Sequence, residues 1–567
     1  MPAEIGKSPE RERARMTWQI VPDYDSHATA RESFAWDLPN SYNPAVDFLR
    51  KHDATDRPAL YQAYPDGRRA TYTFDDLDEQ SSRLANALAD LGIDPGDRVG
   101  VVVPQNPENP LTHLANWKLG AVSIPLSVLF GPDALQYRLA DAGAKAVVVD
   151  PAVRADVEAV RGDCPDLDHV IEIETEDTDG DTRGFDGLLA DFDPEIDVYD
   201  STPDTYTAIM YTSGSTGPPK GVLHSHALWL GRAAAAHNYF DQNFADAVVW
   251  TPADWAWGAA LGGTLFAAWH HGCPVVGYPA EGFDPEDAFA LMAEFGVTTS
   301  FAPPTALRML MDVENPTGRY DLDLRVFAAA GEPLTPEIPA WADETLDGVA
   351  VNEFYGQTEL NLVVGNCSLW FDILPGSTGK PLPGYDVAIA DPDAADDGEL
   401  ERLPPGETGE IAVRPHDDSV FFDEYWDRPQ ATADKQVGGW YLTGDLAERD
   451  DEGYVWFKSR KDDVIITAGY RVGPMEVEEA ILEHPDVGQV GVIGVPDDTR
   501  GEVIKAFVRP AAGVAGSDDL REEIRALVRD RLAEYEYPRE IEFVEELPQT
   551  TTGKIRRLEL RERERDA

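Results

Sequence analysis

The stretch Tyr211-Thr-Ser-Gly-Ser-Thr-Gly-Pro-Pro-Lys-Gly221 lies between the apolar run TYTAIMY, which predicts a β-strand, and a helical pattern over residues 227–238. Glycines allow several backbone N–H groups to turn toward one point, while hydroxyl groups and one lysine add further donors. Such a loop has the materials of a phosphate-binding site. The residues predicted to supply these groups are Thr212, Ser213, Gly214, Ser215, Thr216, Gly217 and Lys220.

Single residues exclude two well-known loops at this place. Pro219 and Gly221 flank Lys220, where a Walker A loop requires Gly and Ser/Thr. Ser213 stands where the nucleophile elbow G-x-S-x-G needs its first glycine. On this stretch alone, the alternative that it is a flexible Gly/Ser loop without a ligand stays open. The interpretation therefore depends on the rest of the chain.

Outward from the loop, β-type apolar runs alternate with helical patterns. The runs include RVGVVVPQ from Arg98, KAVVVD from Lys145, CPVVGY from Cys273 and RVFAAAG from Arg325. This alternation predicts α/β units with largely parallel sheets, helices on their faces and binding sites at the strand ends. After about Gly379, shorter segments with turn signals predict a β-rich subdomain.

We therefore predict an α/β protein with two domains. A large N-terminal nucleotide-binding domain of α/β subdomains spans residues 46–460 and includes the β-rich subdomain at about 380–460. A small, mobile α+β domain spans residues 461–567, and the charged junction KSRKDD is the expected hinge. Residues 1–45 are polar and irregular, which predicts a leader arm that wraps the first domain.

Charge is the strongest signal in the composition. The 567 residues include 105 acidic and 47 basic side chains, for a formal net charge of -58. Nucleic acids and anionic membranes share this sign, so we expect neither as a partner. High salt would screen the self-repulsion, and the composition resembles that of proteins from extreme halophiles.

Nothing in the sequence suggests a membrane or a metal cluster. No run of 18 apolar residues occurs, and the first residues carry charge where a signal peptide would be apolar. We expect a cytoplasmic protein without integral membrane association. The three cysteines are far apart and lack metal-ligand spacing, so neither disulfides nor a zinc site is predicted.

Further motifs follow the loop in a fixed order. They are Gly331-Glu-Pro333, Tyr355-Gly-Gln-Thr-Glu359, Tyr441-Leu-Thr-Gly-Asp445, Arg460-Lys-Asp-Asp463, Gly469-Tyr-Arg471 and Thr552-Gly-Lys554. Together with the loop they resemble the adenylate-forming superfamily, which includes acyl-CoA synthetases, peptide-synthetase adenylation domains and luciferases. The resemblance extends from about residue 45 to the end, and it implies an enzyme that activates a carboxylic acid with ATP and passes it to coenzyme A.

The resemblance assigns roles around the nucleotide. Asp445 is expected to hold the ribose hydroxyls with help from Arg460, and Glu359 to bind Mg²⁺ on the phosphates. Tyr355 offers a stacking face for adenine, and Glu353 an acceptor for its amine. The full implied set besides the loop is Gly331, Glu332, Pro333, Glu353, Phe354, Tyr355, Gly356, Gln357, Thr358, Asp445, Arg460 and Arg471.

Two half-reactions need different groups. Lys554 is expected to stabilise the negative charge that develops when a carboxylate attacks the α-phosphorus, and Thr358 to donate to that phosphate. In this superfamily the C-terminal domain then swings about a hinge, here Asp462, and presents a second face to coenzyme A. Gly469 would line the pantetheine tunnel, and Trp257 would gate the acyl carbonyl.

The acyl pocket is interpreted through the same resemblance. The pocket residues it implies are Trp257, Gly258, Ala259, Ala330 and Gly356. Acetate-specific members carry a tryptophan directly before Q-T-E, where this chain has Gly356, so small residues predict a longer slot and a medium-chain fatty acid. Short-chain, branched or aryl acids stay open, as do transfer to a carrier protein and a non-catalytic nucleotide-binding protein.

Overall fold

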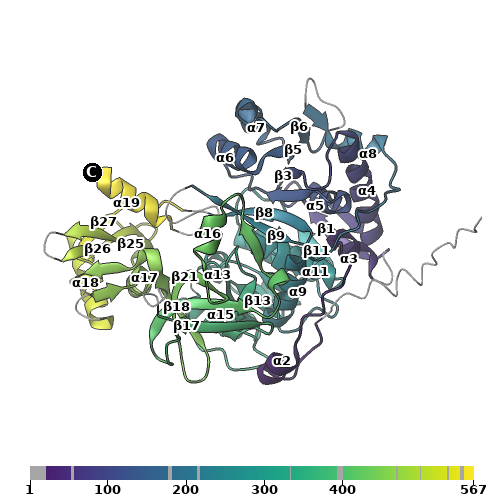
Figure 1. Ribbon diagram of the computed structural model, residues 1–567. Helices are drawn as coiled ribbons and strands as arrows, with labels where there is room; N and C mark the ends of the chain where they lie inside the picture. The colour runs from purple at the N-terminus through teal and green to yellow at the C-terminus, as the bar shows by residue number, and fades with distance from the viewer. Residues whose placement is uncertain are drawn as a thin grey trace, which may run out of the picture.

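The described part of the computed structural model forms four sheets. The structure describes residues 21–52, 56–175, 182–212, 218–332, 334–391, 400–467, 470–497, 500–532, 536–549 and 555–566. Three sheets build a large N-terminal domain, and the fourth builds a small C-terminal domain that lies to one side of it (Figure 1). The predicted α/β class with one large and one small domain is confirmed.

The signature loop belongs to an eight-stranded sheet in the order β19-β9-β8-β4-β3-β5-β6-β7. Its central strands pair in parallel and are covered by helices such as α4 (Phe74–Asp90), α5 (Glu108–Leu119) and α6 (Pro132–Ala142). Its strands are β3 (Arg98–Val102), β4 (Val122–Pro125), β5 (Ala144–Val149), β6 (His169–Glu172), β7 (Thr182–Gly184), β8 (Tyr206–Thr212), β9 (Lys220–Ser225) and β19 (Phe422–Tyr425).

The surroundings of the loop differ from the prediction. The strand β9 intervenes between the loop and the expected helix, α9 (Ala227–Tyr239), and pairs antiparallel with β8 so that Thr212 lies opposite Lys220. The run VLHS can form a strand because β19, some 200 positions later in the chain, pairs with its other edge. A ligand of the loop would therefore sit at a β-hairpin and not at the N-terminus of a helix.

A nine-stranded sheet, in the order β16-β15-β14-β13-β12-β10-β11-β1-β2, shares a core with the first. The core includes α9, whose thirteen residues are all buried, and the segment that follows Trp257, which continues as a π-helical turn (Leu261–Phe266). The strands are β1 (Pro58–Ala63), β2 (Arg69–Thr73), β10 (Val249–Trp250), β11 (Val275–Gly277), β12 (Thr299–Phe301), β13 (Val326–Ala329), β14 (Ala350–Gly356), β15 (Leu362–Gly365) and β16 (Lys380–Pro381).

The third sheet is antiparallel and lies between residues 385 and 460. It carries the Asp445 motif on its longest strand, β21, which pairs with β18 and β22. Its strands are β17 (Tyr385–Ala390), β18 (Thr408–Pro415), β20 (Gln436–Val437), β21 (Trp440–Arg449) and β22 (Val455–Arg460). Helix α2 (His27–Ser33) contacts its strand β17, where Arg31 Nη1 donates to Tyr385 O at 2.5 Å.

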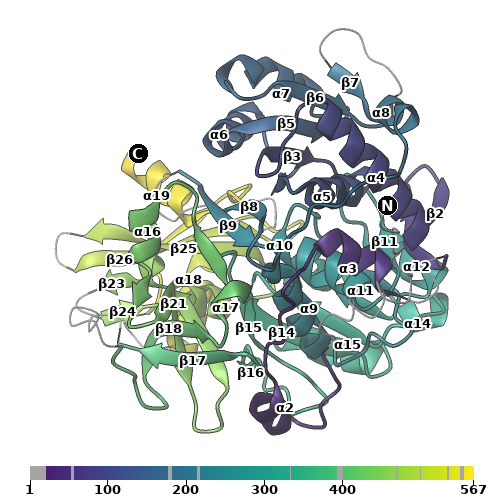
Figure 2. The ribbon, with the colours of Figure 1, turned by 45° about the vertical axis from the view of Figure 1, so that its right-hand side comes forward.

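The C-terminal domain begins after a short 3-10 turn at Lys461–Asp463. Its elements are β23 (Ile465–Thr467), β24 (Tyr470–Val472), α17 (Pro474–Leu482), β25 (Val487–Asp497), β26 (Gly501–Pro510), α18 (Asp518–Arg531), β27 (Glu540–Phe543) and α19 (Arg557–Asp566). Helix α19 lies on the same side of the molecule as the β8–β9 hairpin in both views (Figure 1, Figure 2). Among the described residues, no helix is both long and apolar enough to cross a bilayer.

Candidate active site

A buried carboxylate joins three of the predicted motifs. Asp445 on β21 lies opposite Arg460 on β22, and its side chain is 7% exposed. Its Oδ2 accepts hydrogen bonds from Tyr355 Oη at 2.7 Å and Gln357 Nε2 at 2.5 Å. Arg460 Nε lies 3.6 Å from the other oxygen, Oδ1. One carboxylate oxygen is thus fixed by the protein, and Oδ1 beside Arg460 is left to accept from a ligand.

A second carboxylate lies close to the lysine of the signature loop. Glu359 Oε1 accepts from Tyr425 Oη at 2.7 Å, and Tyr425 Oη is 3.4 Å from Tyr441 Oη. Lys220 Nζ stands 4.9 Å from the centre of the Tyr425 ring. Burial and the Glu359 carboxylate raise the pKa of Tyr425, so its hydroxyl stays a donor. Tyr425 therefore bridges the end of the loop and the Gln-Thr-Glu motif.

The donor set around Glu359 fits Mg²⁺ bound mainly through a substrate. Among the described residues, no three His, Cys, Asp or Glu side chains gather as a metal cluster. Mg²⁺ usually binds one or two protein carboxylates and takes its other ligands from phosphates and water. A single carboxylate, fixed at one oxygen by Tyr425, is suited to that arrangement.

A further cation in this region is not among the residues predicted from the sequence. Lys435 lies within electrostatic reach of Glu359, Glu410 and Asp445, and burial lowers its pKa. Lys461 Nζ contacts Glu410 Oε2 at 3.1 Å. The scarcity of lysine could have indicated Lys435, because the chain has few lysines and this one precedes Asp445 by ten positions. Tyr425 had no such signal, since its contact with Glu359 joins residues 66 positions apart.

The predicted adenine-side residues Glu353, Glu332 and Phe354 have different surroundings. Burial and the nearby carboxylate of Glu479 on α17 raise the pKa of Glu353 to about 8. Glu332 Oε2 accepts from Arg308 Nη2 at 2.9 Å and is thus already paired. Phe354 packs in the core, with its ring centre 4.3 Å from that of Tyr239. Any contact of Phe354 with a nucleotide would therefore come from its backbone.

Several predicted residues cannot be placed by their side chains. Ser213, Gly214, Ser215, Thr216, Gly217, Pro333, Gly469 and Lys554 lie outside the described residues, and Arg471 is described only as backbone in β24. Arg556, two positions after Lys554, lies close enough to Arg138 for its charge to lower the pKa of that guanidinium. The Arg138 guanidinium lies 5.8 Å from the ring centre of Tyr211, which precedes the loop.

The predicted hinge is held by the residue after Asp462. Asp462 is exposed in the Lys461–Asp463 turn, whereas Asp463 is buried. The Asp463 carboxylate binds Arg557 Nη1 at 3.3 Å and Arg561 Nη2 at 3.0 Å, both on α19. A change of dihedral angles at Asp462 would thus turn the C-terminal domain together with α19.

Of the residues expected at the acyl pocket, Trp257 lies beside Gly331, the chain neighbour of Ala330. A Cβ on Gly331 would lie 3.0 Å from the Trp257 ring, so the positive φ of 94° and this contact both require glycine there. Ala259 and Ala330 are buried, at 6% and 7% exposure. A Cβ on Gly356 would lie 2.5 Å from Asn361 O, so the β14–β15 turn itself requires this glycine. The small size of Gly356 is therefore no measure of pocket length.

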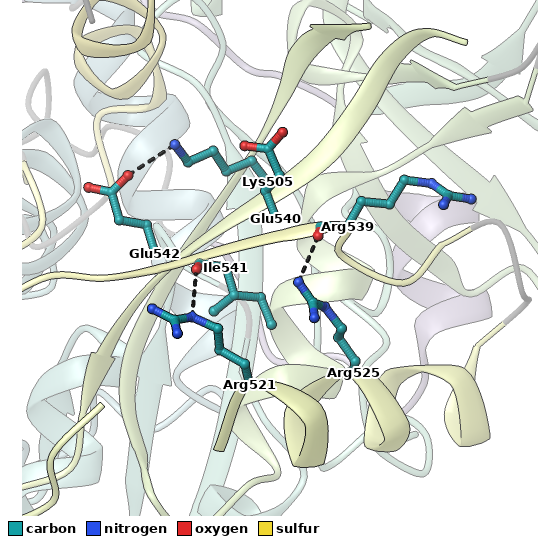
Figure 3. Close-up of a pocket in the computed structure, with 7 residues that line it drawn as sticks. All are labelled: Lys505, Arg521, Arg525, Arg539, Glu540, Ile541 and Glu542. Carbon is teal, nitrogen blue, oxygen red and sulfur yellow. Dashed lines mark hydrogen bonds and ion pairs between the residues drawn. The ribbon is translucent and has the colours of Figure 1, made fainter. Parts of the chain in front are cut away.

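The C-terminal domain carries a separate groove of about 360 Å³, lined by Lys505, Arg521, Arg525, Arg539, Glu540, Ile541 and Glu542 (Figure 3). Three of its cations are satisfied within the domain. Lys505 Nζ lies 3.0 Å from Glu542 Oε2, Arg521 Nε donates to Ile541 O and Arg525 Nη2 to Arg539 O. These cations of the groove therefore hold the domain together, and the groove is not a candidate ligand site.

The protein has a large α/β domain and a small α+β domain. The Asp445–Arg460 pair and the β8–β9 hairpin lie in the large domain, on the side of its junction with the small one. This is the architecture of adenylate-forming enzymes. Residues 50–426 match the family described as AMP-binding enzyme, and residues 476–554 match the AMP-binding enzyme C-terminal domain. The chain belongs to the family of AMP-binding enzymes.

Relatives span nearly the whole chain. It is 34% identical over 560 residues to the mitochondrial acyl-coenzyme A synthetase ACSM3 of Rattus norvegicus, covering 96% of this chain and 94% of the relative. It is 36% identical over 526 residues to the acetyl-coenzyme A synthetase of Bacillus subtilis (strain 168), covering 91% and 89%. Among solved structures, the anthranilate CoA ligase AuaEII with anthranoyl-AMP has a TM-score of 0.84 at 29% identity, covering 93% of this chain and 98% of that one.

Proposed function

We propose that this chain is an ATP-dependent acid:CoA ligase that acts through an acyl-adenylate. In the first step a carboxylate oxygen bonds to the α-phosphorus of ATP while the bond to pyrophosphate breaks. In the second step the thiolate of coenzyme A, its proton lost to solvent, bonds to the acyl carbon and AMP leaves. The observation that supports this most is that Arg460, Tyr355 and Gln357 all contact the buried carboxylate of Asp445.

We assign carboxylates of the site to the ribose and Mg²⁺, and its cations to the phosphates. Oδ1 of Asp445 would accept from the ribose, since Oδ2 is already bonded to Tyr355 and Gln357. Lys220, Thr358 and Lys554 would face the phosphates, and Glu359 would hold Mg²⁺, which neutralises phosphate charge when bound. Loop and domain closure would then exclude water from the adenylate.

The acid, the metal and the setting are further parts of the proposal. The small buried side chains of Ala259 and Ala330 support an acid of medium chain length. Dispersed acidic surface and a net charge of -58 support a salt-rich cytoplasm as the working environment. Coenzyme A as acceptor is supported by the coenzyme A synthetases and ligases that the chain resembles.

The deciding experiment measures AMP release over a panel of carboxylic acids in molar KCl, with and without coenzyme A. We expect AMP release to require both an acid and coenzyme A and to form a thioester. Acid-dependent pyrophosphate release without need of coenzyme A would favour a carrier protein as acceptor. Failure of ATP–pyrophosphate exchange with every acid would leave a non-catalytic nucleotide-binding protein.

The variant Lys554→Ala tests the division into half-reactions. It should reduce adenylate formation by about two to three powers of ten, as loss of one charge-stabilising donor does, and leave thioester formation from presynthesised acyl-AMP largely intact. Lys145→Ala is the matched control, because Lys145 Nζ pairs with Asp97 at 2.6 Å away from the site. Equal loss of both steps in Lys554→Ala would contradict the assigned role.

A further inference from the structure

Arg232 is a buried cation to which the described part of the chain offers no acidic partner. It lies in the middle of α9 and is 2% exposed, and its Nε has no hydrogen-bond partner among the described residues. No residue that the structure describes forms an ion pair with it, and the ionisable groups within its electrostatic reach are His224 and the phenols of Tyr239 and Tyr385, none of which is an acid that pairs with it. Burial raises the pKa of both phenols, so they stay neutral and leave the charge uncompensated.

Two buried lysines have acidic partners, whereas the buried Arg138 has no ion pair among the described residues but donates through Nη1 to Ala134 O at 2.7 Å. Lys51 Nζ contacts Asp47 Oδ1 at 2.5 Å, and Lys118 Nζ contacts Asp78 Oδ1 at 2.6 Å. Burial lowers the pKa of Arg232 to about 10, so the guanidinium is still charged at neutral pH. An unpaired buried charge costs folding free energy. The chain has 105 acidic residues, so an acidic partner could easily have been placed beside Arg232. The missing anion therefore points to a ligand.

The guanidinium points at the expected acyl pocket. Its Nη2 and Nη1 lie 3.3 and 3.6 Å from the place that a Cβ on Gly258 would occupy, and Met210 Sδ lies 3.4 Å from the same place. Farther back, its Cγ and Cδ lie 3.2 Å from a Cβ position on Gly262. Glycines at 258 and 262, one helical turn apart, thus leave room for the whole side chain beside the gate residue Trp257.

The segment opposite Arg232 has an unusual helical form. Leu261–Phe266 is a π-helical turn, a feature that is rare and is often found at functional sites. Gly262 lies within it and faces the stem of Arg232. The local backbone and the glycines are therefore arranged around this cation.

We propose that Arg232 closes the acyl pocket and binds a second, distal carboxylate of the substrate, so that the preferred acids are dicarboxylates. This inference rests on the proposed acid:CoA ligase function and names its substrate class. A guanidinium matches a carboxylate in a planar, two-point contact. A plain alkyl chain of the same length would leave the buried charge unpaired, and the site would discriminate against it.

The test compares acids in pairs of equal carbon number. Succinate, adipate and suberate are measured against butanoate, hexanoate and octanoate by AMP release. We expect kcat/KM to favour at least one dicarboxylate by about 10- to 100-fold, the worth of a hydrogen bond to a charged group. Arg232→Met should remove this preference or invert it, and Arg232→Lys should keep part of it.

Two controls separate substrate binding from a structural role. Arg138→Met removes another buried arginine, 8% exposed, outside the acyl pocket, and should change the rates of both acids of a pair by the same factor. The thermal midpoint of acid-free Arg232→Met should equal or exceed that of the wild type, because a buried charge is lost. A lower midpoint with an unchanged acid ratio would overturn the inference.

The outcomes also distinguish this inference from the function on which it rests. Turnover of monocarboxylates alone, unaffected in ratio by Arg232→Met, would overturn the dicarboxylate preference and leave the ligase function standing. Failure of every acid, with no thermal stabilisation of the protein by any dicarboxylate in the presence of ATP, would overturn both.

Discussion

Two tyrosine hydroxyls each fix one carboxylate of the site, and their removal should affect different ligands. Tyr355 donates to Asp445 at 2.7 Å, and Tyr425 donates to Glu359 at the same distance. The substitutions Tyr355→Phe and Tyr425→Phe delete only these hydroxyls and keep both rings. If Asp445 binds the ribose and Glu359 binds Mg²⁺, Tyr355→Phe should weaken the binding of ATP. Tyr425→Phe should weaken the binding of Mg²⁺.

The expected size follows from the contacts that remain. A hydrogen bond to a charged group contributes about 1.5–3 kcal/mol. Gln357 still donates to Asp445 in Tyr355→Phe, so we expect the lower end, about 1.5 kcal/mol or a tenfold rise in KM for ATP. In Tyr425→Phe we expect the Mg²⁺ concentration for half-maximal rate to rise by about tenfold, with KM for ATP little changed at saturating Mg²⁺.

Initial rates of AMP release over a grid of ATP and Mg²⁺ concentrations separate the two effects. Thermal midpoints of both variants show whether either has simply lost stability. The double variant should show additive free energies, since the two hydroxyls act on different ligands. The reasoning is refuted if both variants shift the same parameter by the same factor.

Three other perturbations follow from the structure. Gly356→Trp should lower the thermal midpoint, because a Cβ there would lie 2.5 Å from Asn361 O; an unchanged midpoint with a shift toward acetate would show that the β14–β15 turn relaxes. Burial, with Asp186 nearby, raises the pKa of Glu108 from 4.5 to about 7. The stability that its neutral form supports is present below pH 4.5 and lost as the pH rises through about 7. Glu108→Gln should therefore stabilise by about 1–3 kcal/mol at pH 8 and little at pH 4.5, as denaturant unfolding at each pH would show. Raising KCl from about 0.1 M to 1 M should raise the thermal midpoint, since the Debye length falls from about 10 to 3 Å; a flat response in calorimetry would contradict the role given to surface charge.

The short motifs and the alternation of strand and helix patterns predicted the fold class, whereas the local backbone after the signature loop was predicted less well. Asp445, Tyr355 and Gln357 occur in motifs whose order in the chain is itself informative, and the structure brings the three together. The strand β9 was missed because its run VLHS is short and half polar. Pairing with β19, which only the folded chain brings near, is what makes that run a strand.

Contacts between distant segments also limit what a small residue means. Gly356 and Gly258 both suggest open space when only residue size is considered. A Cβ at Gly356 would meet the backbone oxygen of Asn361, whereas one at Gly258 would meet the nitrogens of Arg232. The first glycine satisfies a turn and the second makes room for a charge, a distinction that requires knowing the neighbours across the sheet and the helix.

The same reasoning applies to cations in a chain of such acidity. Counting lysines and arginines cannot show which of them matter, because most find an acid: Lys118 pairs with Asp78, and Lys505 in the C-terminal groove pairs with Glu542. A cation that stays unpaired in this surplus of carboxylates needs a reason of its own. Burial makes the reason stronger, since water cannot supply the missing contact. Arg232 and Arg138 meet both conditions among the described residues, but Arg138 donates to Ala134 O, whereas the Arg232 guanidinium lies beside the expected acyl pocket. The anion that Arg232 lacks is therefore best sought in the substrate.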